Sequence, residues 1–147
     1  MAAPERFVLD GSIALAWCFP DEQAAYPQSV LSALGGKAEA VVPALWPLEV
    51  ANALLMGERR KRSSQMDTVA WMGFLSALPI TVDTEAATRA FGDITNLART
   101  HRLTVYDAAY LELAMRLGIA LATLDGELKA AAKAVGVALY KPAVGAA

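Results

Sequence analysis

Four acidic residues of this 147-residue chain are placed where carboxylates could act together: Asp10, Glu49, Asp107 and Asp125. Each is embedded in apolar sequence, as where Val8-Leu9 precedes Asp10. A charge buried among apolar residues needs a partner or a metal ion, and few basic residues stand close to these four in sequence. We therefore interpret the four acids as ligands of a shared divalent cation. The alternative is that each carboxylate only stabilises a helix N-terminus.

A site built from oxygen ligands suits Mg²⁺ or Mn²⁺ better than zinc, and it would activate water and neutralise charge on a phosphodiester. Two polar residues could support it. Ser12, two residues after Asp10, could hold a metal-bound water, although a helix N-cap is an equally good interpretation. Asn52 follows Glu49 by three residues and so shares its helix face, where it could orient that carboxylate. The alternative for Asn52 is a polar residue there by chance.

The elements that must position these residues alternate along the chain. Short apolar runs predict strands at 6–9, 40–42, 80–82, 119–123 and 137–140. Helical patterns predict helices at 13–19, 23–34, 45–60, 66–78, 84–99, 106–117 and 126–135. Strands that alternate with helices indicate an α/β sandwich around a mostly parallel sheet. Ligands bind such sheets beyond the carboxyl ends of the strands, which is where Asp10 and Asp125 are expected.

Length and composition limit the class of protein. No linker divides the chain, so we expect a single domain over residues 1–141 and a loose tail at 142–147. The lone Cys18 excludes a disulfide framework and a zinc site made of cysteines. The chain shows neither a signal-peptide h-region nor an apolar run of about 20 residues, so we expect a cytoplasmic protein without a membrane segment.

The residues around the four acids resemble, in order and spacing, the four acidic motifs of PIN-domain proteins, and in particular of the small bacterial VapC-type toxins. The segments that carry this resemblance are 7–17, 47–54, 103–114 and 121–128. One departure is Gly11, where the family usually has Thr or another small polar residue. The resemblance implies a PIN-like α/β/α sandwich and a metal-dependent endoribonuclease that a cognate antitoxin holds inactive.

The same resemblance implies roles for individual residues. Asp10, Asp107 and Asp125 would bind Mg²⁺ or Mn²⁺ most directly, and Glu49 would complete the site or help to position the attacking water. It also implies a homodimer and a VapB-like antitoxin whose peptide lies over the active-site groove. The aromatic residues near the acids are expected to pack in the core or to dock the antitoxin rather than to stack on bases: Trp17, Trp46, Tyr106 and Tyr110.

One basic cluster could contact RNA phosphates: Arg59, Arg60, Lys61 and Arg62. Equally, cations there would stabilise a helix C-terminus. The net charge of −2, from 13 basic and 15 acidic residues, argues by itself against a nucleic-acid-binding protein. With the four clustered acids set aside, however, 13 basic residues face 11 acids, a balance of +2. An RNA substrate is therefore compatible with the composition.

Two alternatives belong to other classes of protein. A receiver-like signalling module would use an aspartate as phosphoacceptor, but it needs adjacent acids after the first strand, where Gly11 and Ser12 follow Asp10. A catalytically silent PIN-like binding protein would not need all four acids. The sequence does not identify the RNA, the number of metal ions or the antitoxin.

Overall fold

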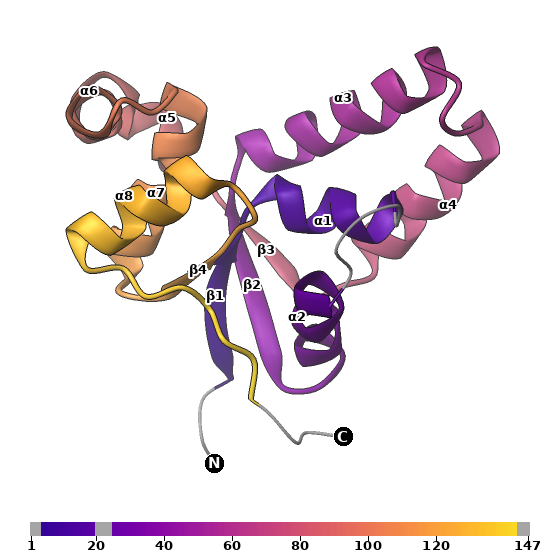
Figure 1. Cartoon of the computed structure of the whole chain (residues 1–147), viewed down its shortest axis with the longest axis horizontal. Helices are drawn as coiled ribbons and strands as arrows, with labels where there is room; N and C mark the ends of the chain where they lie inside the picture. Colours follow the sequence, from indigo (N-terminus) through magenta and orange to yellow (C-terminus); the bar gives the residue numbers. More distant parts are fainter. Residues whose placement is uncertain (1–3, 20–24, 144–147) are drawn as a thin grey trace.

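The structure is a computed structural model that describes residues 4–19 and 25–143. Within them lies a four-stranded sheet in the order β3-β2-β1-β4, and all of its pairings are parallel. Its strands are β1 (Glu5–Leu9), β2 (Ala38–Pro43), β3 (Ile80–Asp83) and β4 (Ala120–Ala122). Strand β1 lies between β2 and β4 (Figure 1). Its Val8 pairs with Val41 of β2 and with Leu121 of β4.

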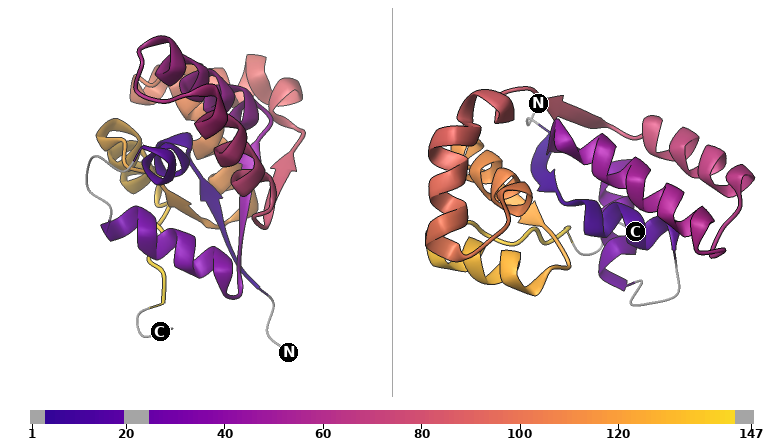
Figure 2. Two further views of the ribbon diagram at one scale, coloured as in Figure 1. Left: turned by 90° about the vertical axis from the view of Figure 1, so that its right-hand side faces the viewer. Right: turned by 90° about the horizontal axis from the view of Figure 1, so that it is seen from above.

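Helices flank the sheet in an α/β/α arrangement. They are α1 (Gly11–Cys18), α2 (Ala25–Gly35), α3 (Leu45–Arg59), α4 (Gln65–Ser76), α5 (Ala86–Arg89), the π-helical η1 (Ala90–Ile94), α6 (Thr95–His101), α7 (Val105–Leu117) and α8 (Gly126–Val135). Seen from above, the α3–α4 pair and the α5–α8 group lie on opposite sides of the molecule (Figure 2, right). The predicted fold class is confirmed.

The core forms around β1 and α7. Phe7, Val8 and Leu9 of β1 are fully buried, as expected for a central parallel strand that is covered on both faces. Helix α7 packs on β1, β2 and β4, and every residue from 108 to 114 in it is buried. Because these elements are fixed by the core, the residues at the end of β1 and at the start of α7 are held at one edge of the sheet.

Three predictions for individual elements are wrong. Helix α1 begins at Gly11, so Ser12 lies inside its first turn and is not its N-cap; Asp10 occupies that position. The predicted strand at 137–140 is a single bridge between Leu121 and Leu139. This segment is held by ring packing instead, because Tyr140 stacks on Phe7 with ring centroids 3.9 Å apart.

The predicted helix at 84–99 consists of α5, η1 and α6. Periodicity does not reveal the π turn, in which Thr95 Oγ1 donates to the carbonyl of Ala90 at 2.5 Å. Residues 23 and 24 of the predicted second helix lie outside the described residues. No helix in the described part of the chain has the length and apolar character needed to span a membrane. The domain boundary at residue 141 stays a prediction.

Candidate active site

Asp10 follows β1 and is 7% exposed. Its Oδ2 accepts two hydrogen bonds, from Ser12 Oγ at 2.6 Å and from Thr123 Oγ1 at 2.7 Å. Both hydroxyl oxygens accept a backbone N–H in turn, from Leu124 and Asp125 respectively, each at 3.0 Å. Each hydroxyl can donate one proton, and Ser12 and Thr123 both donate theirs to Asp10. This relay joins the end of β4 to the end of β1 and fixes the carboxylate.

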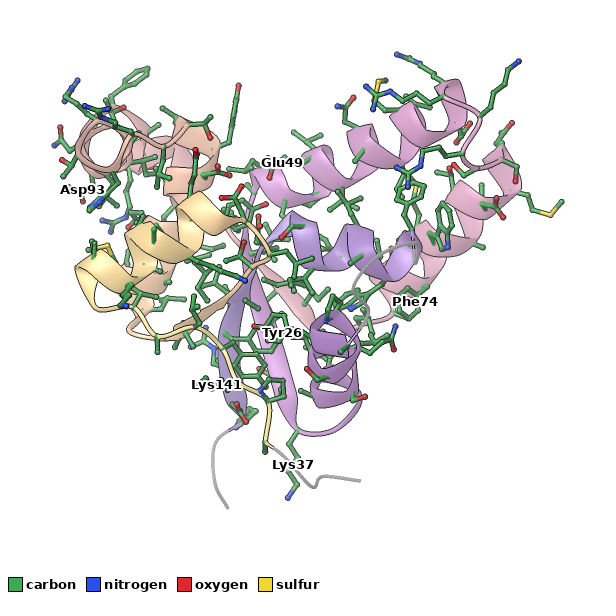
Figure 3. All side chains as sticks on the ribbon, in the orientation of Figure 1. Tyr26, Lys37, Glu49, Phe74, Asp93 and Lys141 are labelled. Carbon is green, nitrogen blue, oxygen red and sulfur yellow. The ribbon has the colours of Figure 1, made fainter. Side chains whose placement is uncertain are left out.

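Glu49 lies in the second turn of α3, in the upper centre of Figure 3, where that helix begins. Tyr110 of α7, which is fully buried, donates its hydroxyl to Glu49 Oε1 at 2.5 Å. Partial burial raises the pKa of Glu49, and the charges of Asp10 and Asp107 raise it further against the opposing effect of the Tyr110 hydrogen bond. The tyrosine thus bridges two elements and holds this carboxyl group near the other acids.

The remaining two acids lie at helix N-termini, as the sequence predicts for Asp107; Asp125, which is expected after a strand, follows β4 and caps the next helix. Asp107 lies in the first turn of α7, where its backbone N–H donates to Thr104 Oγ1 at 3.1 Å. Asp125 is the N-cap of α8, and its Oδ1 accepts the backbone N–H of Leu128 at 2.9 Å. Burial raises the pKa of Asp107, and the charges of Asp10 and Asp125 raise it further. The four predicted acids are therefore linked through Asp107, whose pKa responds to Asp10 and Asp125 and whose own charge raises the pKa of Glu49.

None of the four carboxylates forms an ion pair with a lysine or arginine within residues 4–19 and 25–143, whereas Asp83, Glu85 and Glu112 all pair with Arg116. In the same ranges, no three His, Cys, Asp or Glu side chains are gathered closely enough to ligate one ion as they stand. The donors nevertheless suit a hard cation in kind, because they are carboxylates and hydroxyls. A cation would also relieve the like-charge repulsion that raises the pKa values of Glu49 and Asp107.

A groove of about 760 Å³ begins beside this cluster and runs along α1 and α3. Ser12 and Leu124 line it, and so do Arg60 and Arg62 of the predicted RNA-binding cluster. The guanidinium of Arg62 lies 4.5 Å over the ring of Phe19. Arg59 and Lys61, the other two members of that cluster, are exposed and do not line the groove.

Asn52 is exposed on α3 and lines the same groove. Its predicted role in orienting Glu49 stays a prediction. Ser12, in contrast, contacts Asp10 directly through its hydroxyl.

Two residues of the site, Thr123 and Tyr110, are not predicted by the sequence to be polar partners of the acids. Thr123 stands two residues before Asp125, and the signal for it was a hydroxyl residue at the carboxyl end of a predicted strand. Tyr110 was expected to pack in the core, which it does, but its hydroxyl reaches an acid 61 residues away in the chain. No local pattern could show that contact.

The family model for the PIN domain matches residues 7–134, from β1 into α8 and across all four acids. The chain belongs to the PIN-domain family. Membership supports nuclease activity for this PIN domain. The comparison with curated proteins finds no relative of the chain.

Solved structures with a similar fold include PAE2754 from Pyrobaculum aerophilum, with 25% identity and a TM-score of 0.62 over 88% of this chain and 87% of that chain. VapC20 from Mycobacterium tuberculosis, described as a sarcin–ricin loop cleaving toxin, has 16% identity and a TM-score of 0.65. The match covers 92% of this chain and 99% of that chain. VapBC2 from Rickettsia felis, whose crystal structure is bound to a DNA fragment from its promoter, has 11% identity and a TM-score of 0.63. The match covers 92% of this chain and 97% of that chain.

Proposed function

We propose that this PIN domain is a Mg²⁺- or Mn²⁺-dependent endoribonuclease, the toxin of a toxin–antitoxin pair. The observation that carries the proposal is the cluster of four carboxyl groups at the carboxyl edge of the sheet, held in place and yet without a basic partner among the described residues. The acids of the structural ion-pair network, such as Asp83 and Glu112, each have an arginine partner instead. An uncompensated acidic cluster beside a groove is suited to bind a divalent cation and a phosphodiester.

Each residue of the site has a separate role in the proposed reaction. Asp10, Asp107, Asp125 and Glu49 would hold the cation, which when bound supplies an activated water and neutralises phosphate charge. Ser12 and Thr123 keep Asp10 in one orientation, and Tyr110 keeps Glu49 in place. Asn52 would orient Glu49 or meet the substrate. Of the predicted basic cluster, Arg60 and Arg62 line the groove and would contact RNA phosphates.

The experiment is RNA cleavage by the purified full chain in Mg²⁺ or Mn²⁺, with and without EDTA. We expect cleavage that EDTA abolishes and that falls at least 100-fold in Asp10→Asn. Asp93→Asn is the matched control, because Asp93 is an exposed acid paired with Arg89 at 3.6 Å. Activity that survives EDTA, or Asp10→Asn as active as Asp93→Asn, would show that the acids do not form a metal site.

The partner is proposed to be a VapB-like antitoxin. The similar folds include the toxin–antitoxin complex from Klebsiella pneumoniae, with 15% identity and a TM-score of 0.52 over 81% of this chain and 86% of that chain. The reading frame next to this gene should encode a small protein with a DNA-binding start and an amphipathic tail that contains an arginine. Co-purification of the two chains with suppressed RNA cleavage is the expected result. A neighbour that binds without suppressing cleavage would contradict the antitoxin role.

A homodimer in the cytoplasm is also proposed. On helix α4, Leu75 is buried and Trp71 packs on Phe19. Met72 is exposed, as are Met66 and Val69 on the same helix. Sedimentation of the wild type and of Met66→Lys distinguishes a dimer built on this helix from one built elsewhere.

A further inference from the structure

We propose that the groove between α1 and α3 binds a single-stranded segment of the RNA beside the scissile bond, with Lys129 contacting phosphate at the active-site end and Arg60 at the far end. This inference rests on the proposed function and names how that site takes its substrate. Lys129 belongs to no predicted basic cluster and comes from α8, one turn after Asp125.

The lining residues recur at helical spacing on both helices. From α1 and the residue after it come Ser12, Leu15, Ala16 and Phe19, and from α3 come Asn52, Ala53, Met56 and Gly57. Residues spaced by three and four lie on one helix face, so the groove follows the two axes. Seven residues of helix extend about 11 Å, enough for a short run of nucleotides.

The chemistry of the groove changes along its length. Lys129 lies at the end that Ser12 and Leu124 share with the acidic cluster, and Arg60 and Arg62 lie at the end of α3. Between the cations, the wall is apolar, made by Leu15, Ala53 and Met56. Among the described residues that line it there is no carboxylate. The groove therefore offers cations at its ends and an apolar floor between them.

A single strand of RNA matches this arrangement, because it presents anionic phosphates and the apolar faces of unpaired bases together. A duplex matches it poorly, because stacked and paired bases are not available to the floor and only phosphates would be met. Gly57 shows how closely the wall is packed: a Cβ there would lie 2.7 Å from Phe19 Cζ. The Arg62 guanidinium over Phe19 extends this wall with a planar cation, a surface on which bases stack.

The test measures RNA affinity by fluorescence anisotropy in EDTA, so that the readout does not depend on cleavage. Two pairs of variants remove the same charge from neighbouring positions: Arg60→Ala with Arg59→Ala, and Lys129→Ala with Lys133→Ala. Arg60 and Lys129 line the groove, whereas Arg59 and Lys133 are exposed outside it. We expect the groove variants to weaken binding of single-stranded RNA about five- to tenfold, and the paired controls less than about twofold. Binding of a duplex of the same sequence should not distinguish the members of a pair.

Equal losses within each pair would overturn the proposal, since binding would then follow overall charge. Absence of RNA binding by the wild type would overturn it as well and leave the groove to a protein partner. The proposed function is judged separately. If the two members of each pair differ but the wild type does not cleave RNA in the presence of metal, the proposed RNA-binding groove is supported and the proposed nuclease activity is contradicted. If the wild type cleaves but the pairs do not differ, the nuclease stands and the groove fails.

Discussion

Two residues that carry no charge at neutral pH, Tyr110 and Thr123, determine how two of the four carboxylates are held. Tyr110 is fully buried and Thr123 is 2% exposed, so neither hydroxyl can exchange its protein partner for water. Each donates to one acid, Tyr110 to Glu49 and Thr123 to Asp10. Residues that orient metal ligands in this way typically change metal affinity or activity 10- to 100-fold when mutated.

Tyr110→Phe removes the hydroxyl and keeps the ring that fills the core. We expect Mn²⁺ affinity and RNA cleavage to fall about tenfold or more, because Glu49 loses its fixed orientation. The free energy of unfolding should fall by only about 1–2 kcal/mol. Mn²⁺ binding followed by electron paramagnetic resonance, together with urea unfolding, checks both. Tyr106→Phe is the control, since Tyr106 is 63% exposed; an equal effect there would refute the role of Tyr110.

Thr123→Val replaces the hydroxyl with a methyl group of similar volume. The carboxylate of Asp10 would keep only the Ser12 hydrogen bond, and the backbone N–H of Asp125 would lose its acceptor. We expect Mn²⁺ affinity to fall about tenfold and stability by about 1–2 kcal/mol. Titration calorimetry with Mn²⁺ and thermal unfolding measure the two effects. Thr81→Val, on the exposed side of β3, should leave both unchanged.

Among the elements, β3 and α7 are joined by an ion-pair network that lies apart from the acidic cluster. Arg116 of α7 donates to Asp83 at the end of β3 at 2.8 Å and to Glu112 at 2.9 Å. The side chains of Arg116 and Asp83 are each 15% exposed and that of Glu112 is 6% exposed. Since α7 also carries Asp107 and Tyr110, this network helps to hold the helix on which half of the site depends.

Arg116→Met would leave Glu112 buried with only Arg89, at 4.0 Å, as a partner. Removing one member of a buried ion pair is costly, and we expect the free energy of unfolding to fall by about 3 kcal/mol. Urea unfolding at pH 7 measures it. Arg99→Met, at an exposed site on α6, should cost less than about 0.5 kcal/mol. A loss in Arg116→Met as small as that in Arg99→Met would mean that the network is not stabilising.

The same ion-pair network should make the stability of the fold depend on pH in the acid range. The hydrogen bond from Arg116 holds the pKa of Asp83 below its ordinary value. A carboxyl whose pKa is lower in the folded state stabilises the fold above about pH 4, and this stabilisation is lost as the pH falls through the folded-state pKa. The wild type should therefore lose more stability between pH 5 and about pH 2 than Asp83→Asn does. Unfolding midpoints at several pH values test this, and parallel curves would contradict it.

At the scale of the whole molecule, the net charge of −2 is the sum of two populations of charge. Four acids with linked charges lie at strand ends and helix starts, and cations line the groove that begins beside Asp10. Long-range attraction of RNA should therefore be weak, and binding should depend on a few local contacts. The net charge of the chain disfavours nucleic-acid binding, but the cations that line the groove favour binding of RNA phosphates there.

The dependence of RNA affinity on salt measures that number of contacts. With two to three phosphates neutralised on a single strand, the slope of log K against log salt should be about −1.4 to −2.1. Anisotropy titrations between low and physiological salt provide the slope. Arg60→Ala should reduce its magnitude by about 0.7. A slope steeper than about −4 would indicate a broad electrostatic surface instead of the groove.

The sequence by itself determined the alternation of strands and helices and the positions of the four acids, because both depend on local patterns. Apolar runs that end in Asp10 and helix starts at Glu49 and Asp107 are readable from neighbouring residues. Helix α7, from Val105 to Leu117, was predicted to within a residue because Thr104 caps it and Gly118 ends it. The π turn and the strand expected at 137–140 were missed, because each depends on hydrogen-bond partners that periodicity does not specify.

Only the tertiary structure decided which residues meet. The Tyr110–Glu49 bond spans 61 residues and the Thr123–Asp10 bond spans 113, and both exist because parallel packing brings strand ends and helix starts to one edge. The tertiary structure likewise divided the basic cluster, placing Arg60 and Arg62 in the groove and Arg59 and Lys61 outside it. It also added Lys129 to the groove from the other end of the chain. Such contacts follow from the packing of whole elements, which local sequence does not encode.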